Sequence, residues 1–119
     1  MASVYSIALA LLVFCGAANA KPTATIQTAG DCKAYALATQ RAMVQLKDVP
    51  RVRVIVVCSD VLWHRLQAKA DAERTNTAFT NIRERLTVLR GSVTEDPIEL
   101  RRVLAHEFDH IRCQCSLGE

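Results

Sequence analysis

Two histidines lie four positions apart in the sequence HEFDH, at residues 106–110, and a glutamate follows the first of them. On an α-helix, residues with this spacing share one face and lie about 6 Å apart along the axis, so His106 and His110 can bind one ion. Zinc accepts neutral imidazole nitrogens, and a catalytic zinc site keeps one position open for water. Glu107 would lie beside that position, where its carboxylate can accept a proton from the water. The pattern therefore predicts a zinc site with Glu107 as general base.

The helix that must position these residues has a well-marked start. Asp96 stands at the N-cap, Pro97 at the first helical position and Glu99 three residues past the cap, and all three features are typical of a helix N-terminus. The helix is expected to run from Pro97 to about Cys113. The histidines and Glu107 lie on the flank of its apolar stripe. That stripe is predicted to consist of Leu100, Leu104, Phe108 and Ile111.

Residues 103–110, VLAHEFDH, resemble the active-site helix of zincin metallopeptidases, in the minimal form found in small gluzincin-like domains. The resemblance implies zinc-dependent hydrolysis of peptide bonds, with His106 and His110 as zinc ligands and Glu107 as the base. It also implies that a helix and a small sheet precede the zinc helix. The edge strand of that sheet would lie along the substrate cleft, and residues 77–89 would have to supply it.

The resemblance leaves the third zinc ligand open. A gluzincin takes this ligand from a second helix well downstream, and the sequence ends at Glu119 without one. Cys113 and Ser116 stand where a metzincin would have its glycine and last histidine, so the metzincin pattern is excluded. The candidates are Glu119, Cys113, Cys115 and His64. His64 has a competing interpretation as an ordinary half-buried or surface histidine.

The first 20 residues are predicted to be a cleaved signal peptide. They carry no charged side chain, and their apolar run over residues 4–15 is followed by Ala18-Asn19-Ala20, an A-x-A cleavage signature. The run is shorter than the roughly 20 residues of a membrane span, so no stable membrane anchor is expected after cleavage. The predicted location is therefore secreted or periplasmic.

Four cysteines follow the predicted cleavage site, and an even number in an exported protein indicates disulfides. Because one residue separates Cys113 from Cys115, a bond between them would close a short, strained ring. We therefore expect Cys32 and Cys58 each to bond one member of this pair. A competing hypothesis makes Cys113 or Cys115 a zinc thiolate, which fits an oxidising compartment poorly.

The sequence predicts one zincin-like domain over residues 31–119, preceded by a flexible leader of small and polar residues at 21–30. Its expected fold class is α+β: a small mixed sheet packed against helices, in the order α-β-α-β-β-α, with the HExxH helix near the C-terminus. The expected elements are helix 31–47, strand 51–57, helix 61–73, strands 77–82 and 85–89, and helix 97–113.

Capping residues predict where the first two helices begin, and apolar spacing predicts the buried side of the first. Asp31 is expected to cap the first helix, and Ser59 or Asp60 the second. The apolar side of the first helix is expected to carry Ala34, Ala38, Ala42 and Leu46, together with Leu37 and Val44.

The charge pattern gives no support for nucleic-acid binding. The formal charge is +3, from 15 basic and 12 acidic residues that are interspersed and not interleaved with aromatic residues. The sequence therefore predicts an exported zinc-dependent peptidase that acts on a peptide or protein substrate. The alternative is a non-catalytic exported domain that keeps a zincin-like metal-binding helix and binds another protein. A purely structural zinc site completed by cysteines fits export poorly.

Overall fold

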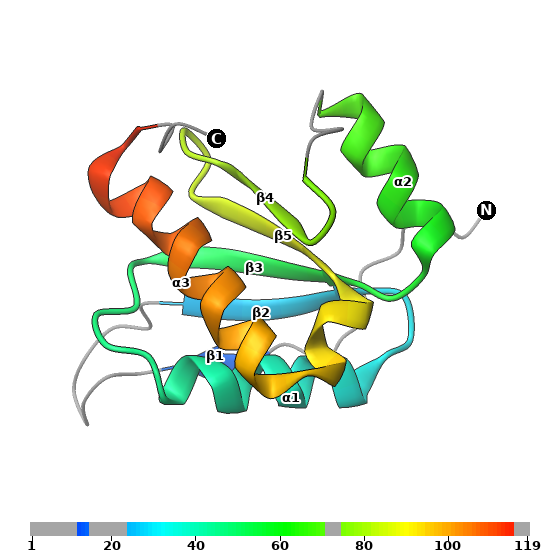
Figure 1. The fold of residues 1–119 in the computed structure, drawn as a ribbon, viewed down its shortest axis with the longest axis horizontal. Coiled ribbons are helices and arrows are strands. Elements are labelled where there is room, and N and C mark those ends of the chain that lie inside the picture. Colours follow the sequence, from blue (N-terminus) through cyan, green and yellow to red (C-terminus); the bar gives the residue numbers. More distant parts are fainter. Residues whose placement is uncertain (1–11, 15–23, 71–74, 116–119) are drawn as a thin grey trace.

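A computed structural model describes residues 12–14, 24–70 and 75–115 of the protein, which form a mixed sheet with helices on both faces (Figure 1). The strand order is β1-β2-β3-β5-β4. Strands β2, β3 and β5 are parallel, whereas β4 and β1 run antiparallel to their neighbours at the two edges. The bounds are β1 Leu12–Phe14, β2 Ala24–Ala29, β3 Val52–Val57, β4 Ala78–Asn81 and β5 Leu86–Arg90. The predicted α+β class with a mixed sheet is confirmed.

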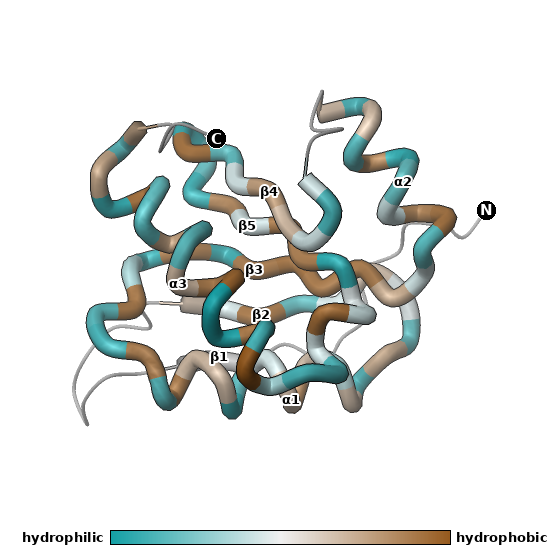
Figure 2. Tube along the Cα trace, viewed as in Figure 1, coloured by the Kyte–Doolittle hydropathy of each residue, from teal (hydrophilic) through white to brown (hydrophobic). Residues whose placement is uncertain are grey.

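The helices cover the two faces of this sheet unequally. Their bounds are α1 Lys33–Val44, α2 Asp60–Lys69, the 3-10 helix η1 Gly91–Glu95 and α3 Pro97–Cys113. Helices α1 and α3 pack on the face that carries Val54 and Val56, and this face holds the main core. Helix α2 packs on the opposite face, where Trp63 is buried against Val57 and Val88. Figure 2 shows β3, which contributes to both faces, as a largely hydrophobic strand.

Strand β2 corrects the prediction of a flexible leader. Residues Ala24–Ala29 pair in parallel with β3 along their whole length, from Ala24 opposite Val52 to Ala29 opposite Val57. Ile26 and Thr28 are fully buried under the helices. The prediction was wrong because small and threonine side chains do not by themselves indicate a disordered segment. Their alternation with Ile26 fits a strand that is covered closely by a helix.

The predicted signal peptide lies outside the described residues, except for β1. This strand pairs with the outer edge of β2, so cleavage after Ala20 would remove it and leave that edge of β2 exposed. The signal peptide itself stays a prediction. Among the described residues, we find no helix that is both long and apolar enough to cross a membrane.

The helix starts follow the predicted caps in two cases out of three. The Asp96 side chain accepts hydrogen bonds from the backbone amides of Ile98 and Glu99 at the start of α3, and Ser59 accepts one from Leu62 at the start of α2. Helix α1 differs, because Cys32 and not the predicted Asp31 is its N-cap, and no side chain caps it. The Cys32 side chain forms a disulfide instead.

That disulfide joins Cys32 to Cys58, so the prediction that each bonds Cys113 or Cys115 is wrong. The two residues follow the neighbouring parallel strands β2 and β3, and their Cα atoms lie 5.6 Å apart, within the usual range for a disulfide. Gly30 allows this close approach. Its φ is +110°, and a Cβ at that position would lie 3.0 Å from the Cys58 sulfur.

We expect the double variant Cys32→Ser/Cys58→Ser to lose about 2–4 kcal/mol of unfolding free energy, because the bridge closes a chain segment of 26 residues. Denaturant titration would measure this loss. The double variant Cys113→Ser/Cys115→Ser is the control, because its bridge spans a sequence separation of only 2 and constrains the unfolded chain far less. Equal losses in the two variants would contradict the prediction.

An ion pair between Asp60 and Arg90 joins the start of α2 to the end of β5. The Arg90 guanidinium donates to both carboxylate oxygens of Asp60 at 3.0 Å, and to Oδ1 of Asn76 at 2.7 Å. These bonds hold the pKa of the Asp60 carboxyl below its ordinary value. The pair therefore stabilises the fold at neutral pH, and this contribution is lost as the pH falls through the folded-state pKa.

Candidate metal site

Helix α3 carries the HEFDH sequence and is held in place by its apolar stripe. The four predicted stripe residues are all buried in the core shared with α1 and the sheet: Leu100, Leu104, Phe108 and Ile111. With this stripe packed, the flank of the helix is turned toward the edge strand β4. The predicted helix bounds of Pro97–Cys113 are confirmed.

The structure brings His106, Glu107 and His110 together. One ligand atom from each lies within 4.8 Å of the other two, and the two imidazole rings are 4.9 Å apart between centroids and perpendicular. Two ligands at about 2.1 Å from one ion lie at most about 4.2 Å apart, so a small rotation of the side chains would let all three contact one ion. This is the one such group that we find in the described part of the chain.

The three residues of the site differ in their exposure to solvent. His106 is exposed, whereas Glu107 and His110 are 3% and 4% exposed. An ion would therefore enter past His106, and Glu107 would form the inner wall. These exposures follow from the positions of the residues around the helix, because Glu107 lies closest to the buried stripe and His106 lies furthest from it.

The ring of His110 is oriented by a backbone carbonyl. Its Nδ1 lies 2.9 Å from the carbonyl oxygen of Cys115. Because a carbonyl oxygen can only accept, Nδ1 carries the proton, and in the neutral ring Nε2 then carries the lone pair. Histidines that bind metals are commonly fixed in this way, with the second nitrogen donating to a carbonyl or carboxylate. His110 is thus prepared to bind a metal through Nε2.

The carbonyl of Cys115 is brought to His110 by a tight turn. Gln114 ends α3 in the left-handed conformation, with φ +53°, and Cys113 and Cys115 on either side of it form a disulfide. The expected pairing with Cys32 and Cys58 failed because this turn folds the two cysteines toward each other, with Cα atoms 5.2 Å apart. Neither sulfur is a thiolate, so the hypothesis of a cysteine zinc ligand is wrong for this structure.

Two further candidates for a third ligand were His64 and Glu119, and the structure describes only His64. His64 is on α2, which covers the opposite face of the sheet from α3, and its Nδ1 lies 3.3 Å from Gln67 Oε1. Glu119 lies outside the described residues. Glu107 is therefore the third metal-binding group that the described residues supply, although the sequence predicted it as a base.

Thr80 and Thr87 are site residues that the sequence analysis missed. They face each other across β4 and β5, with their hydroxyl oxygens 2.9 Å apart, and Thr80 donates to Glu107 Oε1 at 2.8 Å. A hydroxyl has one proton, so Thr87 must donate to Thr80 and Thr80 to the carboxylate. This chain of bonds fixes the inner carboxylate. A threonine pair in a short polar hairpin gives no signal that would identify this role.

We expect Thr80→Val to lower the free energy of unfolding by about 1–3 kcal/mol, because it removes a donor from a buried carboxylate. Thr87→Val removes only a neutral bond between hydroxyls, and its cost should be about 1 kcal/mol. Thermal or denaturant unfolding of the metal-free protein would measure both. A larger loss for Thr87→Val would show that the bonds do not run in the order inferred above.

No family model, curated protein or solved structure matches this chain. What the site can do follows from its own geometry. Two imidazoles and a carboxylate at these distances can hold a metal ion.

Proposed function

We propose that the protein is an exported zinc-dependent peptidase. The observation that carries the proposal is the convergence of His106, Glu107 and His110 within 4.8 Å, beside an edge strand of the sheet. Neutral imidazole ligands favour zinc over the hard cations calcium and magnesium. The orientation of His110 through the Cys115 carbonyl supports metal binding in particular.

In this proposal, each residue has a separate task. His106 and His110 hold zinc, which when bound would acidify a water ligand and polarise a substrate carbonyl. Glu107 accepts the proton of the attacking water and later returns it to the leaving amine. Thr80 holds the carboxylate of Glu107 in place from β4. The proposed third zinc ligand is Glu119, four residues beyond Cys115.

The position of β4 supports a peptide as substrate. This strand pairs with β5 on one side, and its other side has no strand partner among the described residues. Its Thr80 contacts the site directly. An extended peptide could add to such an edge through backbone hydrogen bonds, as the resemblance to zincins implies. The scissile bond would then lie beside α3.

The disulfides agree with an oxidising compartment. Together with the predicted signal peptide, they support a secreted or periplasmic location.

The test is metal content and peptide hydrolysis by the protein purified with its disulfides intact. We expect one zinc per chain, and cleavage of unstructured peptides that stops when a chelator removes the metal. The absence of bound metal under zinc-replete conditions would refute the metal site. Zinc binding without hydrolysis of any peptide in a diverse library would refute the peptidase.

A second function is supported by the burial of Glu107. Its carboxylate is 3% exposed and is bonded to Thr80, so a substrate water has little access to it in this conformation. The alternative is a non-catalytic domain in which the metal stabilises a surface that binds another protein. Substitution of Glu107 separates the two functions.

A further inference from the structure

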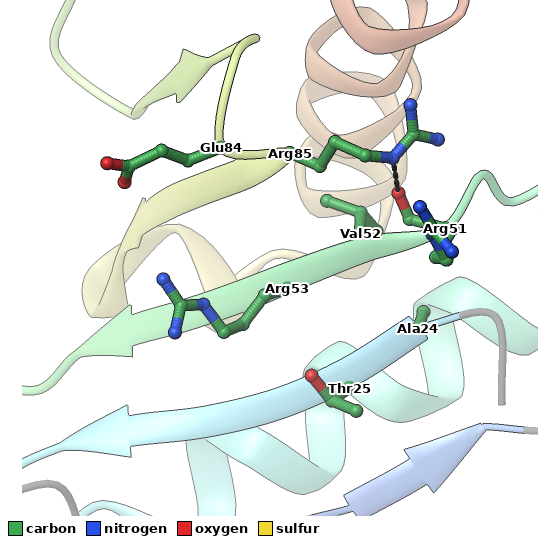
Figure 3. A pocket seen from close by; sticks show the side chains of 7 residues that line it. All are labelled: Ala24, Thr25, Arg51, Val52, Arg53, Glu84 and Arg85. Carbon is green, nitrogen blue, oxygen red and sulfur yellow. Dashed lines mark hydrogen bonds between the residues drawn. The ribbon is translucent and has the colours of Figure 1, made fainter.

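A basic cavity lies outside the metal site, at the N-terminal ends of β2 and β3 and the turn between β4 and β5 (Figure 3). Its volume is about 330 Å³, at the lower end of the range for small-molecule sites. Three arginines and one glutamate contribute to its lining. The residues that line it are Ala24, Thr25, Arg51, Val52, Arg53, Glu84 and Arg85.

The sheet leaves this cavity open because α2 covers only part of one face. Arg53 points to the same face as Ile55 and Val57, which pack against α2. At the start of β3, however, Arg53 is exposed and its neighbours across the sheet are Thr25 and Leu86. The charged Arg53 thus lies on the same face of β3 as the apolar Ile55, two residues further along the strand.

Backbone contacts hold the second arginine in place. Arg85 has a φ of +51°, an uncommon conformation for a residue with a side chain. Its carbonyl accepts from the Arg53 amide at 2.9 Å, and its Nε donates to the Arg51 carbonyl at 2.7 Å. In Figure 3, the guanidinium groups of Arg85 and Arg51 lie on the same side of the cavity, and that of Arg53 lies on the other side.

The positive charge at this place is not neutralised within the described residues. No carboxylate of that part of the chain forms an ion pair with Arg51, Arg53 or Arg85. Figure 3 shows the Glu84 carboxylate on the opposite side of the cavity from Arg51 and Arg85, on the side toward which Arg53 also points. The like charges of Arg51 and Arg85, which lie on one side of the cavity, repel each other, and a bound anion would reduce this repulsion.

We propose that this cavity binds an anionic group with several oxygens, of the phosphate- or sulfate-ester type. Guanidinium groups bind such oxygens in pairs through two parallel N–H donors. Arg51 and Arg85 supply one cluster of donors, and Arg53 supplies another from the floor formed by the sheet. The Thr25 hydroxyl, which also lines the cavity, adds a neutral donor.

The experiment is a titration of the disulfide-intact protein with inorganic phosphate, inorganic sulfate, a sugar phosphate and a sulfated disaccharide, followed by NMR shifts of backbone amides. We expect saturable binding of at least one of these anions, with the largest shifts around Thr25, Arg53 and Arg85. Arg85→Gln and Arg53→Gln should each weaken binding about 10-fold. Arg53→Gln keeps the contact between Arg85 and Arg51, so it remains informative if Arg85→Gln fails to fold.

Arg83→Gln is the matched control, because Arg83 is exposed in the same turn and does not line the cavity. It should leave the affinity within about twofold. Tighter binding of the sugar phosphate would point to a small phosphorylated molecule, and tighter binding of the disaccharide to a sulfated carbohydrate. Lack of saturation by all four probes, or equal weakening by Arg83→Gln, would overturn the proposal.

Discussion

His106→Ala is expected to weaken zinc binding strongly while leaving the metal-free fold intact. The imidazole of His106 is exposed and lies on the solvent side of the site, so its loss leaves no cavity in the core. As a direct ligand, it should contribute more than the 10–100-fold in affinity that an outer partner of a ligand contributes. We therefore expect zinc affinity to fall by more than about 100-fold, measured by competition with a chelator of known affinity.

His64→Ala is the control for this experiment. His64 is also an exposed helical histidine, but it lies on α2, away from the site. Zinc affinity should not change in this variant. If both variants weaken zinc binding equally, the metal is bound adventitiously by surface histidines. His110→Ala should behave differently from both, because the 4% exposed His110 ring contributes to packing as well as to metal binding.

Glu107→Gln is expected to lower peptidase activity by about 100-fold or more, the usual contribution of a general base. The glutamine amide oxygen can still accept the hydrogen bond of Thr80, which now goes to Glu107 Oε1. Melting temperature and zinc content should therefore stay nearly constant. The measurement is kcat/KM on a cleaved peptide, together with metal analysis of the same samples. Asp109→Asn, an exposed substitution within the same HEFDH sequence, is the control and should retain activity.

Two other outcomes would change the assignment. Loss of zinc in Glu107→Gln would make Glu107 a ligand instead of a base. Alternatively, a measured biological activity could persist in Glu107→Gln and disappear in His110→Ala. The metal would then stabilise a binding surface, and the protein would not act as a peptidase.

The helix of the site and the spacing of its histidines could be predicted from the residues alone. Both depend on contacts within a few residues: Asp96 caps the amides directly after it, and His106 and His110 meet because one helical turn separates them. The apolar stripe of α3 was also predictable, because its large apolar side chains all lie on one side of the helix. That side is therefore the one expected to be buried.

In helix α1, the spacing of apolar residues did not predict the buried face correctly. The predicted apolar side included Val44, which is 61% exposed, whereas Thr39 and Met43 are buried. Alanines occur around much of this helix, so their spacing does not select a face. The contacts of α1 with β2 and α3 selected it instead, and those contacts are made between segments far apart in the sequence.

Contacts between residues far apart in the sequence became visible only in the folded protein. The pairing of Cys32 with Cys58 follows from β2 lying beside β3, and the bond between Thr80 and Glu107 follows from β4 lying beside α3. Strand order and register determine these contacts, and both are set by the burial of many apolar side chains at once. Local spacing supplied the chemical groups of the site, but the sheet determined the partners that orient them.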